Sequence, residues 1–234
     1  LKAIDLFIQK NKIKFNTFFD PFSGTGCVAE YFNKENNSIV ANDLLFSNYV
    51  FLKTFLNIKK TDDNKIKKII TKFNKIKSLK ENYFSKNYGN KFFTMNNARL
   101  IGTIREKIEK ISITKDEKFI LLTSLIYAID KIANTVGHYD AYIKKLDKLS
   151  SLELNAPLIE TERNKNNKVY NEDANKLADI ITADMTYIDP PYNSRQYSDT
   201  YHLLENLAEW KKPPLRGKAN KMNRDHIKSE YCLK

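Results

Sequence analysis

Glycines and a carboxylate gather in the motif Asp20-Pro-Phe-Ser-Gly-Thr-Gly26, which could bind a small ligand. Glycine accepts positive φ angles and lets a ligand approach the backbone closely, and a helix that begins there offers free N–H groups. The motif lacks the third glycine of a dinucleotide fingerprint and the lysine of a P-loop, so it disfavours NAD and ATP. Asp20 would repel a pyrophosphate and attract an ammonium group. The alternative interpretation is a tight turn without a ligand.

A second carboxylate, Asp43, follows Asp20 by 23 positions and ends another short apolar stretch. A carboxylate at the tip of a second strand is well placed to accept hydrogen bonds from ribose hydroxyls. When Asp43 is taken alone, a solvent-exposed helix cap is an equally good interpretation.

The motif Asp189-Pro-Pro-Tyr192 is the most specific of the three. Its two prolines fix a rigid, extended turn that presents a carboxylate together with an aromatic ring. Ligands of open α/β sheets bind at the edge where such a turn would follow a strand. A structural proline turn is the alternative, but four specified residues match by chance in only about one of a thousand chains of this length.

The apolar pattern predicts the elements that position these motifs. Short apolar stretches predict strands at 16–20, 38–43, 168–171 and 185–189, and helical spacing predicts helices at 1–15, 27–32 and 44–58. A strand, a glycine turn, a helix and a strand in succession form a βαβ unit, which implies a parallel sheet with a right-handed crossover. We therefore predict an α/β fold with a parallel sheet.

A mainly helical insertion is predicted over 59–150, with helices at 61–80, 116–134 and 139–149. The helix at 61–80 has isoleucines on one face and lysines on the other. This lysine face is equally consistent with a track for DNA phosphates and with an ordinary solvated helix face.

The charge balance favours a polyanionic partner. The 234 residues include 40 Lys and Arg against 28 Asp and Glu, a formal net charge of +12, and nucleic acid is the first candidate. The abundance of Lys, Asn and Ile is also what an AT-rich coding genome would produce. No apolar run approaches the roughly 20 residues of a spanning helix, so no membrane partner is expected. Two cysteines make neither a disulfide framework nor a four-cysteine zinc site, so we expect a reduced, cytoplasmic protein without a metal.

The first and third motifs together resemble those of adenine-specific DNA methyltransferases. Residues 20–26 are similar to the cofactor motif of that family, and residues 189–192 are similar to its catalytic motif. The order of cofactor motif, long insertion and catalytic motif is typical of the alpha group, which includes Dam-like enzymes and restriction-modification methylases. The segments 193–205 and 134–142 also resemble parts of that group. The resemblance does not extend to 59–115.

The resemblance implies a Rossmann-like fold, S-adenosylmethionine as the cofactor and double-stranded DNA with a flipped adenine as the substrate. Residues 1–58 and 167–234 would form the catalytic domain, and 59–166 a helical insertion that is a candidate target-recognition region. The residues implied to bind the cofactor are Asp20, Pro21, Phe22, Gly24, Gly26, Asp43 and Asp173. Those implied to act on the target base are Asp189, Pro190 and Tyr192.

The sequence also departs from the family pattern. A lysine-bearing segment expected before the cofactor motif is not clear, and about three strands expected after the catalytic motif are not visible. We therefore expect the sheet to be incomplete at its C-terminal side, and a second chain or a further segment to complete it. Methylation of cytosine N4 or of RNA stays open, as does a non-catalytic DNA-binding or specificity subunit. Asp rather than Ser or Asn at 189 favours adenine by analogy with the family.

Overall fold

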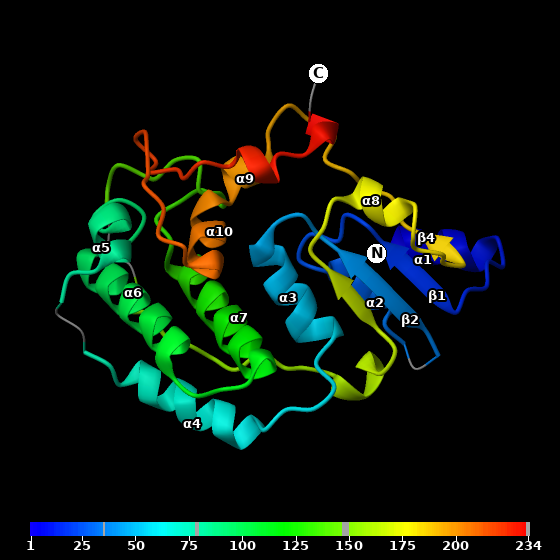
Figure 1. Cartoon of the computed structure of the whole chain (residues 1–234), viewed down its shortest axis with the longest axis horizontal. Coiled ribbons are helices and arrows are strands. Elements are labelled where there is room, and N and C mark those ends of the chain that lie inside the picture. Colours follow the sequence, from blue (N-terminus) through cyan, green and yellow to red (C-terminus); the bar gives the residue numbers. More distant parts are fainter. Residues whose placement is uncertain (35, 78–79, 147–149, 233–234) are drawn as a thin grey trace. The chain divides into compact units, whose positions relative to one another are not determined.

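The computed structural model describes residues 1–34, 36–77, 80–146 and 150–232. Internal contacts divide the chain into two compact units (Figure 1). The first, which we call the sheet unit, comprises Leu1–Thr61 and Ile159–Pro190. The second, the helical unit, comprises Asp62–Leu158 and Pro191–Lys234. The predicted division into a catalytic domain and a target-recognition insertion concerns function and stays a prediction.

The sheet unit is built on a parallel sheet, as the sequence predicted. Its strands in the described residues are β1 (Thr17–Asp20), β2 (Ser38–Asn42), β3 (Lys168–Tyr170) and β4 (Met185–Thr186). Their order is β3-β2-β1-β4, and every neighbouring pair is parallel. The predicted strand at 185–189 is shorter than expected, although the Tyr187 N–H still donates to the Phe19 carbonyl at 2.9 Å.

Helices cover both faces of this sheet because its central strands are apolar on both sides. Phe18 and Ile39 pack on one face with residues of α1 (Lys2–Lys10), α2 (Cys27–Phe32) and α3 (Phe46–Leu56). The next residue of each strand points to the opposite face, where Phe19 and Val40 pack against Leu177 of α8 (Ala174–Ala178). The strand ends therefore have fixed positions between two packed layers.

The helical unit confirms most of the predicted helices. In the described residues it contains α4 (Asp63–Asn74), α5 (Tyr83–Tyr88), α6 (Met95–Lys110), α7 (Lys115–Ile132), α9 (Tyr197–Thr200) and α10 (His202–Glu209). The central helix α7 is buried along most of its length and begins with a capping box of Thr114 and Glu117. No helix of the described residues is long and apolar enough to cross a membrane.

The predicted helix at 139–149 is wrong over its described part, 139–146, where the chain has a turn at 139–140 and then no helix; residues 147–149 lie outside the described residues. The backbone N–H of Tyr139 donates instead to the Thr200 carbonyl at 2.9 Å. The N–H of Ile143 donates to the Asn134 carbonyl at 3.0 Å. The second bond uses an amide group that a helix beginning at Tyr139 would need for its own ladder, because the Ile143 N–H would donate to the Tyr139 carbonyl.

Candidate active site

The glycine turn after β1 has the geometry that its glycines allow. Gly24 and Gly26 have φ angles of 55° and 94°, in the left-handed region. A Cβ atom on Gly26 would lie 2.8 Å from Cδ2 of Leu52, so a larger residue would also clash with α3. Both positions therefore favour glycine, and the space beside Gly24 is open, with no heavy atom within 4 Å of an added Cβ.

Asp43 clamps this turn from the end of β2. Its Oδ2 accepts a hydrogen bond from the Gly24 N–H at 2.9 Å. Its Oδ1 accepts from the Leu45 N–H at 2.9 Å and from Nδ2 of Asn48 at 3.0 Å. Burial raises the pKa of Asp43 to about 6, although these three hydrogen bonds act to lower it. A carboxylate offers about four acceptor positions, so roughly one stays open to a ligand.

Asp20 is the least satisfied carboxylate of the sheet edge. Its side chain is 1% exposed, and its Oδ1 atom has no hydrogen-bond partner among the described residues. Burial is the main cause that raises its pKa to about 7, and the nearby charges of Asp43 and Asp189 raise it further. A buried acceptor of this kind fits a cationic donor such as an ammonium group.

The residues between Asp20 and the glycines have structural contacts of their own. Pro21 is buried, and its carbonyl accepts from Nδ2 of Asn42 at 3.0 Å. Phe22 is half-buried, and a hydrogen bond from its backbone lowers the pKa of Asp20.

Asp189 is exposed just beyond β4, and its Oδ2 accepts a hydrogen bond from the Tyr187 hydroxyl at 3.2 Å. Both Asp189 and Asp20 raise the pKa of Tyr187, after the larger effect of burial. Asp20, at the end of β1, is thus within electrostatic range of both Asp43 and Asp189. Pro190 is half-buried, and the ring of Tyr192 is 83% exposed.

Asp173 lies three positions after the end of β3 and caps α8. Its Oδ1 accepts from the Asn175 N–H at 2.8 Å, as an N-cap residue does. The structure therefore places Asp173 at the carboxyl side of β3, with its carboxylate half-buried.

Asn42 is a site residue that sequence reasoning missed. It is 1% exposed, and its Nδ2 donates to the carbonyls of Pro21 and Glu172, both at 3.0 Å. Its Oδ1 accepts from the Glu172 N–H at 3.0 Å, so one side chain joins the loops after β1 and β3. Asn171 adds bonds to the carbonyls of Asp43 and Leu44. An amide inside the apolar stretch 38–42 was the available signal.

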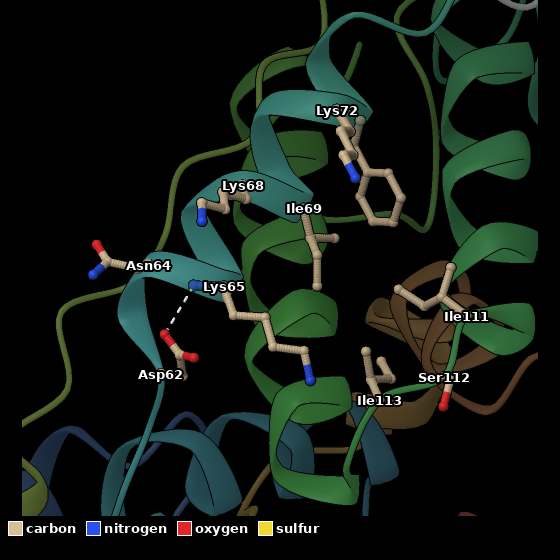
Figure 2. Close-up of a pocket in the computed structure, with 10 residues that line it drawn as sticks. Asp62, Asn64, Lys65, Lys68, Ile69, Lys72, Ile111, Ser112 and Ile113 are labelled. Atoms are coloured by element: carbon tan, nitrogen blue, oxygen red, sulfur yellow. Dashed lines mark hydrogen bonds between the residues drawn. The ribbon is translucent and has the colours of Figure 1, made fainter.

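The lysine face predicted on the helix at 61–80 belongs to α4 in the helical unit, and residues 78–79 of that range lie outside the described residues. Lys65, Lys68 and Lys72 line a pocket of about 570 Å³. Figure 2 shows Ile111 and Ile113 across from these lysines. Lys65 pairs with Glu117 at 2.6 Å, so part of this charge is neutralised within the unit. In the described part of the chain, no group of His, Cys, Asp and Glu is arranged to hold a metal.

Sequence comparison identifies related proteins over the same residues. The chain is 38% identical over 235 residues to the modification methylase StsI of Streptococcus sanguinis, which covers 93% of this chain and 36% of the relative. It is 35% identical over 257 residues to the type II methyltransferase M.FokI of Planomicrobium okeanokoites, which covers 100% of this chain and 39% of the relative.

A third relative is shorter. The chain is 32% identical over 231 residues to the type II methyltransferase M.NlaIII of Neisseria lactamica, covering 93% of this chain and 67% of the relative. The chain thus spans little more than a third of the length of StsI and M.FokI. The model of one protein family matches residues 1–234, and the parallel α/β sheet agrees with the fold that the sequence resemblance implied. The chain therefore belongs to the D12 class N6 adenine-specific DNA methyltransferase family.

Proposed function

We propose that the protein transfers a methyl group from S-adenosylmethionine to the 6-amino group of adenine in double-stranded DNA, as a modification methylase. Membership of the family implies this donor and a DNA substrate. The observation that carries the proposal is the gathering of Asp20, Asp43 and Asp189 at one sheet edge, with an unpartnered oxygen on Asp20.

The residues of the sheet unit fit the proposed cofactor. The open Oδ1 of Asp20 would accept from the ammonium of its methionine part, and Gly24 and Gly26 would let it approach the turn. The remaining acceptor position of Asp43 would take a ribose hydroxyl, and Asp173 would accept from the adenine amino group. Pro21 and Phe22 would line the same turn. When bound, the cofactor supplies an electrophilic methyl group on its sulfonium.

At the target base, the protein has to orient the 6-amino group of adenine for methyl transfer. The lone pair of the adenine 6-amino group is delocalised into the ring, so the amine is a poor nucleophile. The carboxylate of Asp189 and the carbonyl of Pro190 would accept its two N–H bonds and favour a pyramidal nitrogen. Such alignment and electrostatic stabilisation need no covalent intermediate.

The base must also leave the duplex. Extrusion costs a few kcal/mol, and stacking on an aromatic ring returns about 1–3 kcal/mol per base. The ring of Tyr192 is 83% exposed and is our candidate for this stacking.

Single-molecule sequencing of DNA from cells that express the gene tests this function directly. We expect N6-methyladenine at one short sequence context in expressing cells and none at that context in cells with an empty vector. Methylated cytosine, or modification of RNA alone, would replace the proposed substrate. Unmodified DNA from cells that contain folded, cofactor-binding protein would contradict the activity.

A further inference from the structure

Two asparagines of the helical unit join three segments that are far apart in the sequence. Asn134, which follows α7 and is 4% exposed, donates through Nδ2 to the carbonyls of Lys91 at 3.0 Å and Ile143 at 2.7 Å. Its backbone also exchanges hydrogen bonds with Phe92 and Ile143. These bonds hold the segments at 91–92 and 143 beside each other.

The third segment is a tight hairpin at 216–221. Arg216 and Lys221 exchange backbone hydrogen bonds of 2.8 and 2.9 Å. Between them, Gly217 and Asn220 take positive φ angles of 74° and 52°. The hairpin is therefore fixed by its backbone, and the side chains at its tip take no part in closing it.

Asn220 anchors this hairpin to the segment that Asn134 also binds. Its Oδ1 accepts from Nζ of Lys91 at 3.3 Å, and its Nδ2 donates to the Asn87 carbonyl. Its backbone carbonyl accepts from the Tyr88 hydroxyl at 3.4 Å. The contacts that Asn134 and Asn220 make through their side chains are thus made by neutral amides.

The three segments carry cations that have no ion pair with any described residue. We call them the clamped basic surface, and they are Lys91, Lys144, Lys145, Arg216 and Lys218. All except Lys91 are exposed. Residues 210–224 contain six Lys and Arg and no Asp or Glu.

Carboxylates that contact these segments are already neutralised. Lys221 binds Asp140 at 2.6 Å, and Arg224 binds Asp199 at 2.6 Å. This network ties the hairpin to α9, which follows Tyr192 closely in the chain. The clamped basic surface is therefore linked to α9, which begins five residues after Tyr192, the proposed base-stacking residue.

The lysines of α4 lie at the other end of the same unit. Lys65 of α4 pairs with Glu117 in the first turn of α7, whereas Asn134 follows the last turn. The 18 residues of α7 span about 27 Å, and Figure 1 shows α4 and α9 at opposite ends of this helix.

We propose that the clamped basic surface grips the phosphate backbone of the DNA that carries the target adenine. The proposal rests on the proposed function. Cations without ion pairs to described residues, four of the five exposed and carried by segments that hydrogen bonds hold together, fit a polyanionic partner such as the DNA backbone. Phosphate contacts set the position of a duplex and give no sequence preference, so recognition of the target sequence lies elsewhere.

Salt dependence of DNA binding tests this surface. The hairpin variant, Arg216→Ala/Lys218→Ala, removes two exposed positive charges from the clamped basic surface. The control variant, Lys67→Ala/Lys68→Ala, removes two positive charges from α4, at the other end of α7. Each phosphate contact contributes about 0.9 to the slope of log affinity against log salt. Between 50 and 200 mM NaCl, the unchanged chain should therefore lose about tenfold more affinity than the hairpin variant. Fluorescence anisotropy with a labelled 30-base-pair duplex measures both slopes.

The control variant should keep the slope of the unchanged chain. A hairpin variant with an unchanged slope, or a control variant with the same loss, would overturn the proposal. Tighter binding to a duplex RNA of the same sequence, lost in the hairpin variant, would also overturn it. Tritium-methyl transfer by the unchanged chain tests the proposed function separately from the clamped basic surface. If the chain methylates DNA but the hairpin variant keeps the salt slope of the unchanged chain, only the role of the surface is refuted.

Asn220→Gly tests whether the side chain of Asn220, which anchors the hairpin to the segment at 87–91, is needed for DNA binding. Glycine keeps the positive φ angle but removes both side-chain contacts to the segment at 87–91. We expect the salt slope to fall part of the way toward that of the hairpin variant. A lower melting temperature with an unchanged slope would make Asn220 a purely structural residue and would remove the clamp from the proposal.

Discussion

At the scale of single residues, the two aspartates of the proposed site differ in what already holds them. Asp20 is buried with an unpartnered oxygen, whereas Asp189 is exposed and accepts from a tyrosine hydroxyl. A buried carboxylate of this kind keeps its proton until a cation replaces it. We therefore propose that Asp20 pairs with the cationic ammonium of the cofactor, whereas Asp189 accepts from the neutral amino group of the target base.

Cofactor affinity should depend on pH through Asp20. Its pKa of about 7 lies above the ordinary 3.8, so below pH 7 the carboxyl is mostly protonated and must lose its proton to pair with an ammonium. Affinity should therefore fall as the pH drops below about 7, by up to about tenfold per pH unit. Asp43, with a pKa of about 6, adds to this only at lower pH.

Calorimetry in phosphate and in imidazole at pH 6.5 measures the effect, because a released proton changes the observed heat with the buffer. The variant Asp20→Asn should bind more weakly and lose the pH dependence between pH 6 and 7. A proton release that persists in Asp20→Asn would assign the linkage to another group.

Asp189→Asn should impair methyl transfer while leaving cofactor binding nearly intact. The amide keeps an acceptor oxygen and the size of the side chain but loses the charge that would orient the amine. An electrostatic contact of this sort typically contributes about 2.7–4 kcal/mol, a hundredfold or more in rate. Tritium-methyl transfer to duplex DNA, beside cofactor titration of the same variant, measures the two effects separately. A variant that transfers methyl groups at the unchanged rate would remove Asp189 from the catalytic assignment.

At the scale of elements, strands were predicted well because apolar runs and turn residues are local signals. β1, β2 and β3 match the predicted strands to within one residue at each end. The segment 139–149 has a helical pattern of apolar residues, yet no helix forms in its described part. The N–H groups of Tyr139 and Ile143 donate instead to the carbonyls of Thr200 and Asn134. The positions of Asp20 and Asp43 at strand ends were predictable in the same local way, whereas Asp189 lies three residues beyond the end of β4. The bridging by Asn42 was not, because its partner Glu172 lies 130 residues away.

A cluster of asparagines lies just before β3, where the chain comes back to the sheet. Asn164 is 0% exposed and donates to the carbonyls of Phe55 at 3.0 Å and Ile58 at 2.9 Å. Its Oδ1 accepts from Nδ2 of Asn33 at 2.9 Å. Asn167 adds a bond from the Ile39 N–H at 2.8 Å to its Oδ1. These amides connect the end of α3, the loop after α2 and the start of β3.

Asn164→Ala should therefore destabilise the sheet unit. The change removes one side-chain hydrogen bond each from the carbonyls of Phe55 and Ile58 and from the amide of Asn33, which costs about 2 kcal/mol or more in the free energy of unfolding. Urea unfolding followed by circular dichroism measures the loss. Asn96→Ala, at an exposed position of α6, is the matched control and should stay within about 0.5 kcal/mol. An equal effect of both variants would contradict the role of the cluster.

At the scale of the molecule, the two compact units offer separate optical signals. The single tryptophan, Trp210, belongs to the helical unit, where it is 8% exposed and its ring lies 5.2 Å from the guanidinium carbon of Arg105. The residues proposed to bind the cofactor all belong to the sheet unit. Tryptophan fluorescence therefore reports on the unit that does not hold the proposed cofactor site.

Cofactor binding should stabilise the sheet unit more than the helical unit. At a free concentration 100 times its Kd, a ligand adds about 2.7 kcal/mol to the unfolding free energy of the unit that binds it. We expect the circular dichroism transition in urea to shift further than the tryptophan transition. Equal shifts by both probes would mean that the two units unfold as one.

The strand order has a consequence for the time course of synthesis. β1 and β2 pair with each other early in the chain, but their outer neighbours β4 and β3 come after the segment 62–158. At roughly 5–20 residues per second, Met185 leaves the ribosome about 7–30 s after Asn42. Throughout that interval Phe18, Phe19, Ile39 and Val40 lack part of their final cover. The nascent chain is then most dependent on chaperones, whereas α5, α6 and α7, which are consecutive in the chain and each contact the next, can pack together as they emerge.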